Sequence, residues 1–190
     1  MTPFRRVCAA VFLCVAAASS ARAEEDARAQ VLATVQGLFD AMASKDAAAG
    51  RKLFLPEARF FSVRVEAGAP IVGTFTIEEG LRRWAESSEA LLERIWSAEV
   101  RIHGRIATVW TPYDFHRDRK FSHCGIDAFD LVRTAEGWRL AGGVYTMEPE
   151  GCAPSPLGPP PAGVIGASGV IGAIGASGAS GGATPRTQRR

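Results

Sequence analysis

The stretch that decides the fold is residues 106–147, IATVWTPYDFHRDRKFSHCGIDAFDLVRTAEGWRLAGGVYTM. Residues 106–116, 121–133 and 138–147 are rich in β-branched and aromatic side chains, which predicts three strands. The segments between them are only four residues long, and short connections between long strands indicate antiparallel hairpins. With a further predicted strand at residues 91–102, the chain forms a meander of four strands.

Helices precede this meander. Apolar side chains recur at helical spacing in residues 25–44, namely Val31, Leu32, Val35, Leu38, Phe39 and Met42. Asp46 begins a second short helical stretch, which we expect to end at Pro56 because proline disrupts a helix interior.

A small hairpin and a third helix follow. Residues 58–65 and a second run that ends at Phe75 predict two short strands. Thr76 and Glu79 have the spacing of a capping box at a helix start. The order of elements predicts an α+β fold, with N-terminal helices packed on a curved, mostly antiparallel sheet.

The N-terminus has the features of a signal peptide. Arg5 and Arg6 precede an apolar run at residues 7–18, and Ala21-Arg22-Ala23 provides a cleavage site. We expect residues 1–23 to be removed, which predicts a periplasmic or secreted protein without stable membrane insertion. The alternative is an uncleaved membrane anchor, but the run is shorter than the roughly 20 residues that span a bilayer.

The C-terminal residues 153–190 differ from the rest of the chain. Pro-rich sequence leads into glycines at every third position from 163 to 181. Collagen shares this period, but the triplets GVI, GAS and GAI contain no proline, which disfavours a triple helix. We predict a disordered Pro/Gly/Ala-rich tail, which leaves residues 24–152 as one domain.

The charge of that domain argues against nucleic acid as a partner. Six of the 22 basic residues lie outside residues 24–152, while all 20 acidic residues lie inside, so the domain has a net charge of −4. A nucleic-acid-binding domain usually has a basic surface.

The two cysteines outside the predicted signal peptide are Cys124 and Cys152. An even number of cysteines in an exported protein predicts a disulfide between them. The alternative is two buried thiols, which pack as small apolar groups. Simple strand counting places Cys124 opposite Pro149, so the bond requires the chain to bend back after Glu148.

Several motifs resemble a known family. They are LFD at residues 38–40, FF at 60–61, YDF at 113–115, FSHCGIDAF at 121–129 and GWRL at 137–140. In this order of elements they resemble the nuclear transport factor 2-like superfamily, and most closely its small bacterial SnoaL-like members of unassigned function. The resemblance implies a cone-shaped domain with a pocket. Because that superfamily contains ketosteroid isomerase, scytalone dehydratase, polyketide cyclases and members that only bind, fold does not select a reaction.

Turn lengths predict which side chains share the pocket, because side chains alternate faces along a strand. With a two-residue turn at positions 118 and 119, Asp114 is expected opposite His123, and Trp110 opposite Asp127. A turn at residues 136–137 places Phe129 opposite Val144 and Asp127 opposite Thr146. A three-residue turn at 103–105 brings Arg94 onto this face, near Asp114. Its expected ligand-binding residues are Arg94, Trp96, Trp110, Phe129 and Trp138.

This arrangement predicts a proton-transfer site. A histidine beside a carboxylate can act as a general base, so we assign this role to His123 with Asp114. Asp127, near indole rings, is the expected acid or second base. The alternative is that Asp114 and His123 form a structural pair. His103 and His116 flank turns and are expected to be solvated, and a single inward histidine does not favour a zinc site.

The predicted function is binding of a small apolar or aromatic molecule, with cofactor-free isomerisation, dehydration or cyclisation as the possible chemistry. The rival hypothesis is a non-catalytic association module whose pocket is filled by its own side chains.

We also predict a homodimer through the other face of the sheet. The expected interface residues are Val109, Tyr113, Phe115, Ile126, Tyr145 and Met147, because an apolar face exposed to water favours association. The alternative is that the chain's own terminal segments cover that face.

Overall fold

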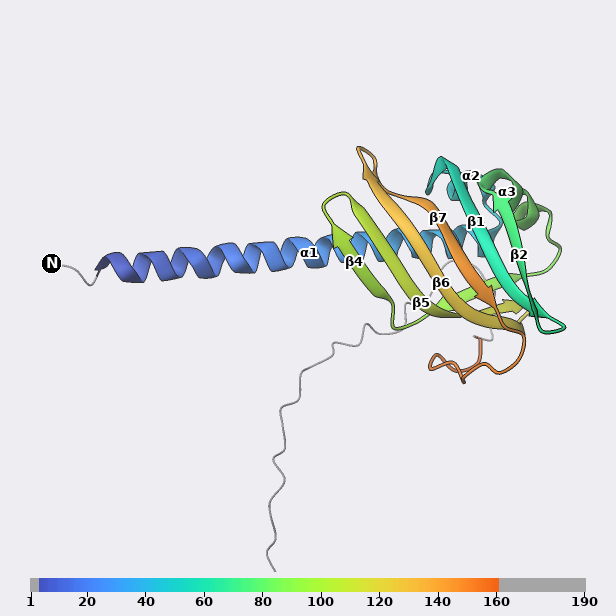
Figure 1. The fold of residues 1–190 in the computed structure, drawn as a ribbon. Coiled ribbons are helices and arrows are strands. Elements are labelled where there is room, and N and C mark those ends of the chain that lie inside the picture. The colour runs from blue at the N-terminus through green and yellow to red at the C-terminus, as the bar shows by residue number, and fades with distance from the viewer. Residues whose placement is uncertain (1–3, 161–190) are drawn as a thin grey trace, which may run out of the picture.

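The computed structural model describes the backbone of residues 4–160 and the side chains of residues 22–160. Three helices and seven strands follow one another along the chain (Figure 1). In chain order they are α1 (Phe4–Ser44), α2 (Ala47–Arg51), β1 (Phe54–Glu66), β2 (Ala69–Thr76), α3 (Ile77–Glu86), β3 (Leu91–Ile95), β4 (Glu99–His103), β5 (Ile106–Arg117), β6 (Lys120–Thr134) and β7 (Gly137–Met147).

The seven strands form one curved sheet. Its order is β2-β1-β7-β6-β5-β3, and β4 pairs with β5 beside β3. Every neighbouring pair is antiparallel except β1 and β7, which run parallel. The predicted fold class, α+β with N-terminal helices on a mostly antiparallel sheet, is therefore confirmed.

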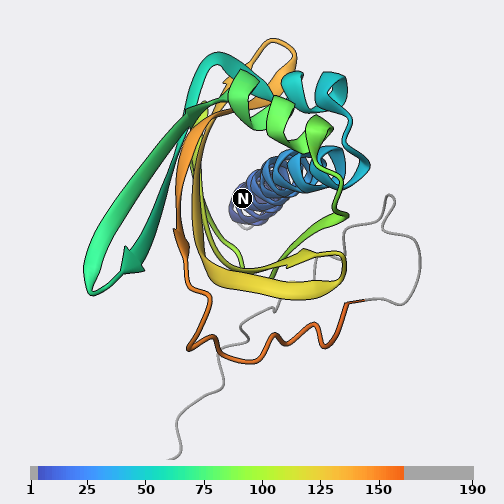
Figure 2. The same cartoon turned by 90° about the vertical axis from the view of Figure 1, so that its right-hand side faces the viewer.

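Helix α1 lies along the concave side of the sheet, and α2 and α3 close the same side (Figure 2). The predicted apolar face of α1 is buried, with Val31 and Val35 fully inaccessible to solvent. Burial of each large apolar side chain stabilises a fold by roughly 1.5–3 kcal/mol. Arg28 also joins α1 to β4, because its guanidinium donates to the carbonyls of Ala98 (2.8 Å) and Val100 (3.3 Å).

The predicted signal peptide is part of α1, which runs without a break past Ala23. Among the residues that the structure describes, no helix is both long enough and apolar enough to cross a membrane. From residue 22 onward, where the side chains of α1 are described, the first buried position is Val31.

The short helices have the caps that the sequence indicates. The Asp46 side chain accepts a hydrogen bond from the Ala49 amide at the start of α2, and Thr76 and Glu79 form the complete capping box of α3. The expected end of α2 at Pro56 is wrong. Helix α2 ends at Arg51, and Pro56 lies within β1 where the β1/β7 register is irregular, a position where a missing amide is tolerated.

One β-bulge sets the register between β5 and β6. The two-residue turn is where it was predicted, and His116 pairs with Phe121. The next pair is Phe115 with His123, so Ser122 has no partner on β5. An extra residue in one strand shifts all later pairs by one. Thr111, and not Trp110, therefore faces Asp127, and Cys124, not His123, faces Asp114.

The predicted register between β6 and β7 is also off by one, and one predicted strand is divided in two. Asp127 pairs with Tyr145 and Phe129 with Gly143, where the sequence had indicated Thr146 and Val144. The predicted strand at 91–102 is divided into β3 and β4 around Ser97, whose φ of 49° breaks the extended backbone. As a result, Leu91, Glu93 and Ile95 of β3 face the concave side. On β4, the even-numbered Val100 and Ile102 face the same side.

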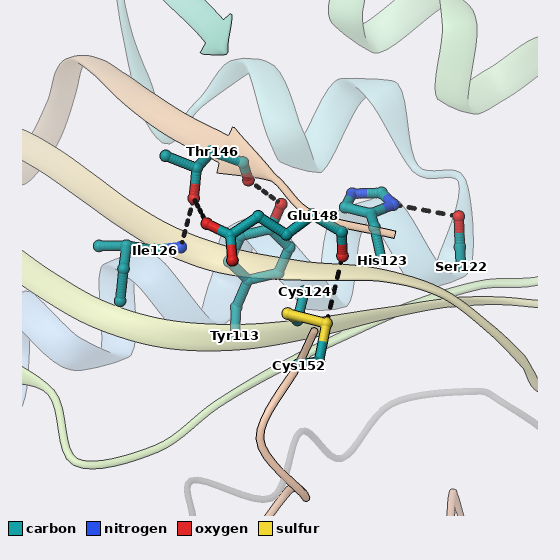
Figure 3. The surroundings of a disulfide bond; sticks show 8 residues. All are labelled: Tyr113, Ser122, His123, Cys124, Ile126, Thr146, Glu148 and Cys152. Carbon is teal, nitrogen blue, oxygen red and sulfur yellow. Dashed lines mark hydrogen bonds between the residues drawn. A yellow bond between two sulfur atoms is a disulfide. The ribbon is translucent and has the colours of Figure 1, made fainter. Parts of the chain in front are cut away.

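The predicted disulfide between Cys124 and Cys152 is present, with its Cα atoms 6.1 Å apart (Figure 3). Cys124 pairs with Glu148 through two backbone hydrogen bonds of 3.0 and 2.9 Å, one residue before the expected Pro149. The chain then bends back, helped by a positive φ of 77° at Gly151.

Residues 153–160 run below the convex face of the sheet (Figure 2). These residues are the first part of the predicted disordered tail. They form neither helix nor strand, but they lie against the sheet near the disulfide. Residues 161–190 lie outside the described part of the chain. Self-cover of the convex face, the alternative to a dimer, is thus present at this end of the sheet.

Candidate functional site

A cavity of about 410 Å³ lies between the concave face of the sheet and helices α1 and α3. We call it the inner cavity. Most of its lining is aromatic or aliphatic, with Leu38, Phe39, Met42, Phe54, Phe60, Phe75, Ile77, Trp84, Leu91, Tyr113, Phe115, Phe129, Tyr145 and Met147. Its ionisable lining consists of Glu93, Asp127, His123, Arg83, Arg117 and the two tyrosines. An apolar cavity with a few polar groups is typical of small-molecule sites.

Three of the eight residues predicted to act as catalytic or ligand-binding groups line this cavity. They are His123, Asp127 and Phe129. Trp138 is buried in the core but does not reach the cavity lining, and Trp110 is 55% exposed on the convex face. The predicted ligand-binding roles of Trp110 and Trp138 therefore do not fit this cavity.

Arg94, Trp96 and Asp114 lie on the other side of the sheet. They line a second cavity of about 460 Å³, the outer cavity, between the convex face and residues 151–160. The expected proximity of Arg94 and Asp114 is correct, since the guanidinium Nε and terminal NH2 nitrogen donate to the two carboxylate oxygens at 2.8 and 2.5 Å. The predicted pairing of Asp114 with His123 is wrong, because the bulge at Ser122 places them on opposite faces.

His116 is the histidine that lies beside Asp114. Its Nδ1 is 3.6 Å from Asp114 Oδ1, and its side chain is 5% exposed. The expectation that His116 is solvated is wrong. Its burial lowers its pKa. The buried Arg94–Asp114 pair is structural, and removal of one partner of such a pair typically costs about 3–5 kcal/mol.

Glu93 is the site residue that sequence reasoning missed. It extends from β3 into the inner cavity, where it shares the lining with Asp127, and the two carboxyl groups are close enough to interact when one of them is protonated. Desolvation, followed by the nearby charge of Asp127, raises the pKa of Glu93 well above its ordinary value. The available signal was the alternation Leu91, Glu93, Ile95, whose two apolar members are buried.

Asp127 is 3% exposed, and its Oδ2 has no hydrogen-bond donor within the described structure unless a carboxyl group supplies one. Desolvation raises the pKa of Asp127 to about 7, and the hydrogen bond from Glu93 acts in the opposite direction. A proton on Glu93 is the donor that the Asp127 carboxylate otherwise lacks. Above about pH 7, with Glu93 protonated and Asp127 ionised, the two groups therefore carry one negative charge between them.

His123 contributes a neutral wall of the cavity. Its ring lies 5.0 Å from the ring of Phe115, and its Nδ1 lies 3.0 Å from Ser122 Oγ. Burial, with a smaller effect of Arg117, lowers the pKa of His123 to about 4. The imidazole is therefore uncharged at neutral pH, and its role as a base stays a prediction without Asp114 as its partner.

Tyr113 spans the floor of the cavity. Its hydroxyl donates a 2.6 Å hydrogen bond to the carbonyl of Thr146 (Figure 3). Gly125 pairs with Tyr113 across the strands, and a Cβ at Gly125 would lie 2.6 Å from Thr146 Oγ1. Glycine is thus required for β7 to approach β6 closely enough for this bond.

The residues predicted for a dimer interface face inward, with one exception. Tyr113, Phe115, Tyr145 and Met147 line the inner cavity, and Val109 is buried in the core. Only Ile126 lies on the convex side, where it lines the outer cavity. The predicted interface is therefore wrong in its residues.

The raised pKa of Asp127 predicts a pH-dependent stability. Because the folded pKa (about 7) exceeds the ordinary value of 3.8, the folded state binds this proton more tightly than the unfolded state. The free energy of unfolding should therefore fall between about pH 4 and pH 7. At pH 8 the free energy of unfolding of Asp127→Asn, measured by denaturant titration, should exceed that of wild type by on the order of 2–4 kcal/mol. The two free energies should converge below pH 4.

The exposed Asp130 on the same strand offers the matched control. Asp130→Asn should follow the wild-type profile of stability against pH. An Asp127→Asn profile parallel to wild type would show that Asp127 ionises as an exposed carboxyl does.

Comparisons with known proteins agree with this architecture. A family model described as "Putative lumazine-binding" matches residues 26–146. No curated protein matches the sequence significantly.

Solved structures with the same fold have low sequence identity to the chain. A nuclear transport factor 2-like protein with a cystatin-like fold from Novosphingobium aromaticivorans is 17% identical, with a TM-score of 0.54 over 72% of this chain and 90% of the other. The β subunit of a putative aromatic-ring-hydroxylating dioxygenase from the same organism is 10% identical, with a TM-score of 0.57 over 69% and 95%. A putative dehydratase from Streptomyces avermitilis is 17% identical, with a TM-score of 0.50 over 65% and 96%.

These identities support a shared fold and no shared activity. The family model, however, covers more than half of the chain. The chain therefore belongs to the family described as "Putative lumazine-binding", and it has the nuclear transport factor 2-like fold.

Proposed function

We propose that this protein binds a small, largely apolar, planar molecule in the inner cavity. The observation that carries the proposal is the cavity itself, whose volume of about 410 Å³ falls in the range of small-molecule sites. Its aromatic walls suit a flat ring system, and the name of the family suggests a two-ring heterocycle such as lumazine. An open cavity favours this proposal over the rival association module, which required a filled pocket.

Cofactor-free proton transfer is the second candidate function. It is supported by the pKa of about 7 at Asp127, since a group that titrates near the working pH is suited to general acid–base catalysis. Isomerisation, dehydration and cyclisation are reactions of this type. Loss of turnover in Asp127→Asn with ligand binding retained would be its signature.

The binding proposal is tested with two planar probes, lumazine and 2-naphthol. Titration followed by calorimetry should give saturable binding of one molecule per chain. His123→Ala removes part of the cavity wall and should weaken binding by about tenfold, equivalent to ~1.4 kcal/mol. His116→Ala, a change to the other buried histidine but in the outer cavity, should leave the affinity within about twofold.

Two results would contradict the proposal. The first is that neither probe binds wild type in a saturable manner. The second is that the two histidine variants weaken binding equally. Thermal unfolding of both variants establishes that they are folded under the titration conditions.

We also propose that the protein forms a homodimer through a row of side chains on the convex face. Paired positions across four strands place Phe61, Val144, Ala128 and Trp110 in line. Phe61 is 43%, Val144 44% and Trp110 55% exposed, and such an apolar row favours association. Trp110→Glu should convert a dimer to a monomer in light scattering, while Val65→Glu on the β1–β2 hairpin should not. A wild-type monomer at high concentration would exclude the dimer.

Export is a further proposal, supported by the basic start, apolar run and Ala-Arg-Ala sequence of residues 5–23. N-terminal sequencing of protein produced in an exporting bacterial host should begin at Glu24. Ala23→Leu should block cleavage, because the peptidase requires a small residue there. An intact N-terminus in the wild-type protein would contradict the proposal.

A further inference from the structure

The inner cavity contains two carboxyl groups and no basic partner for either. Glu93 and Asp127 extend from β3 and β6, and β5 lies between these strands. Within the described residues no ion pair joins either carboxyl to a basic side chain.

The other charged and titratable groups around the pair come from each surrounding element. On β5, Arg117 is paired with Glu89 at 2.6 Å, and on α3, Arg83 lies 5.3 Å above the Phe75 ring. The remaining neighbours are His123, Tyr113, Tyr145, Asp114 and Glu148. The α1 side chains that line the cavity are the apolar Leu38, Phe39 and Met42. None of these groups neutralises the pair.

A single negative charge in an apolar cavity restricts what can bind. An anionic ligand would add a second negative charge where the local dielectric is low, which is strongly unfavourable. A neutral ligand avoids this repulsion. Because an ionised carboxylate is only an acceptor, its best partner is a ligand O–H or N–H group.

We propose that the inner cavity selects uncharged planar molecules that present an O–H or N–H group to Asp127, and that Glu93 is a positioning residue whose protonated carboxyl group donates a hydrogen bond to Asp127. The inference rests on the proposed function, because it concerns the ligand of the same cavity. It assigns Glu93 the neutral acid form, so that its O–H group orients the Asp127 carboxylate. No proton leaves Glu93 when the ligand binds.

Methylated probe pairs test the requirement for a donor. 1,3-Dimethyllumazine has the ring system of lumazine without its N–H groups, and 2-methoxynaphthalene has that of 2-naphthol without its O–H group. At pH 8 wild type should bind 2-naphthol at least about tenfold more tightly than 2-methoxynaphthalene. The lumazine pair is compared at pH 7, because lumazine is a weak acid that is partly ionised at pH 8. The affinity for 2-naphthol should fall as the pH decreases below about 7, as Asp127 takes up a proton.

Two substitutions test the role of Glu93. Glu93→Gln retains an N–H donor at the same distance and should preserve the preference for 2-naphthol over 2-methoxynaphthalene. Glu93→Leu removes the donor and should reduce this preference by at least about fivefold. Because the readout is a ratio of two affinities for one variant, a general loss of stability does not change its meaning, and the wild-type ratio is informative even when a variant does not fold.

The outcomes separate this inference from the proposed function. Equal binding of methylated and unmethylated probes to wild type would overturn the donor requirement and leave the binding function standing. An altered ratio in Glu93→Gln equal to that in Glu93→Leu would overturn the neutral acid at Glu93. Absence of binding by all four probes would contradict the proposed function itself.

Discussion

The register between β5 and β6 is the constraint on which the rest of the structure depends. Ser122 forms a bulge just after the hairpin turn, and every later pair of these two long strands is shifted by one residue. The β5 side chains that share a face with His123 and Asp127 are therefore Ala107, Val109, Thr111, Tyr113 and Phe115. A bulge also increases the local twist and bend of a strand, which suits a sheet that curves around α1 (Figure 2).

Buried carboxylates on the two faces of this sheet have opposite kinds of neighbour. On the convex side, Asp114 has a bidentate partner in Arg94, so its charge is compensated. On the concave side, Asp127 has Glu93 as its neighbour, and two like charges in a poorly solvated space cannot both be present without a large cost. The Glu93–Asp127 arrangement therefore stabilises a bound proton, whereas the Arg94–Asp114 arrangement stabilises an ion pair. The carboxyl pair costs stability at neutral pH, and sites with this property are commonly functional.

Much of the fold could be predicted from the sequence because it follows from local patterns. The apolar spacing of α1, the capping box at Thr76 and the two-residue turn after Arg117 are all determined by neighbouring residues, and the structure contains each of them. The disulfide between Cys124 and Cys152 could be predicted because only two cysteines follow the predicted signal peptide.

The site was less predictable because it depends on the parity of long strands. Ser122 and Ser97 carry no sequence signal as strong as a Gly or Pro, yet each reverses which residues face the cavity. Asp114 and Arg94 were accordingly assigned to the wrong face, although their mutual contact was correct. Glu93 was missed because the assumed face placed its neighbour Arg94 in the pocket. Positions on β6, such as Asp127 and His123, were unaffected because the bulge lies before them.

The central claim is that Glu93 and Asp127 share the inner cavity and that the pair holds one proton above about pH 7. Its most direct test is a ¹³C NMR titration of the side-chain carboxyl groups, with assignment by comparison to Asp127→Asn and Glu93→Gln. The account predicts that Asp127 titrates near pH 7, and that Glu93 stays protonated well above the range of an exposed glutamate. Ionisation of both groups below about pH 5, as for carboxyls in water, would contradict it.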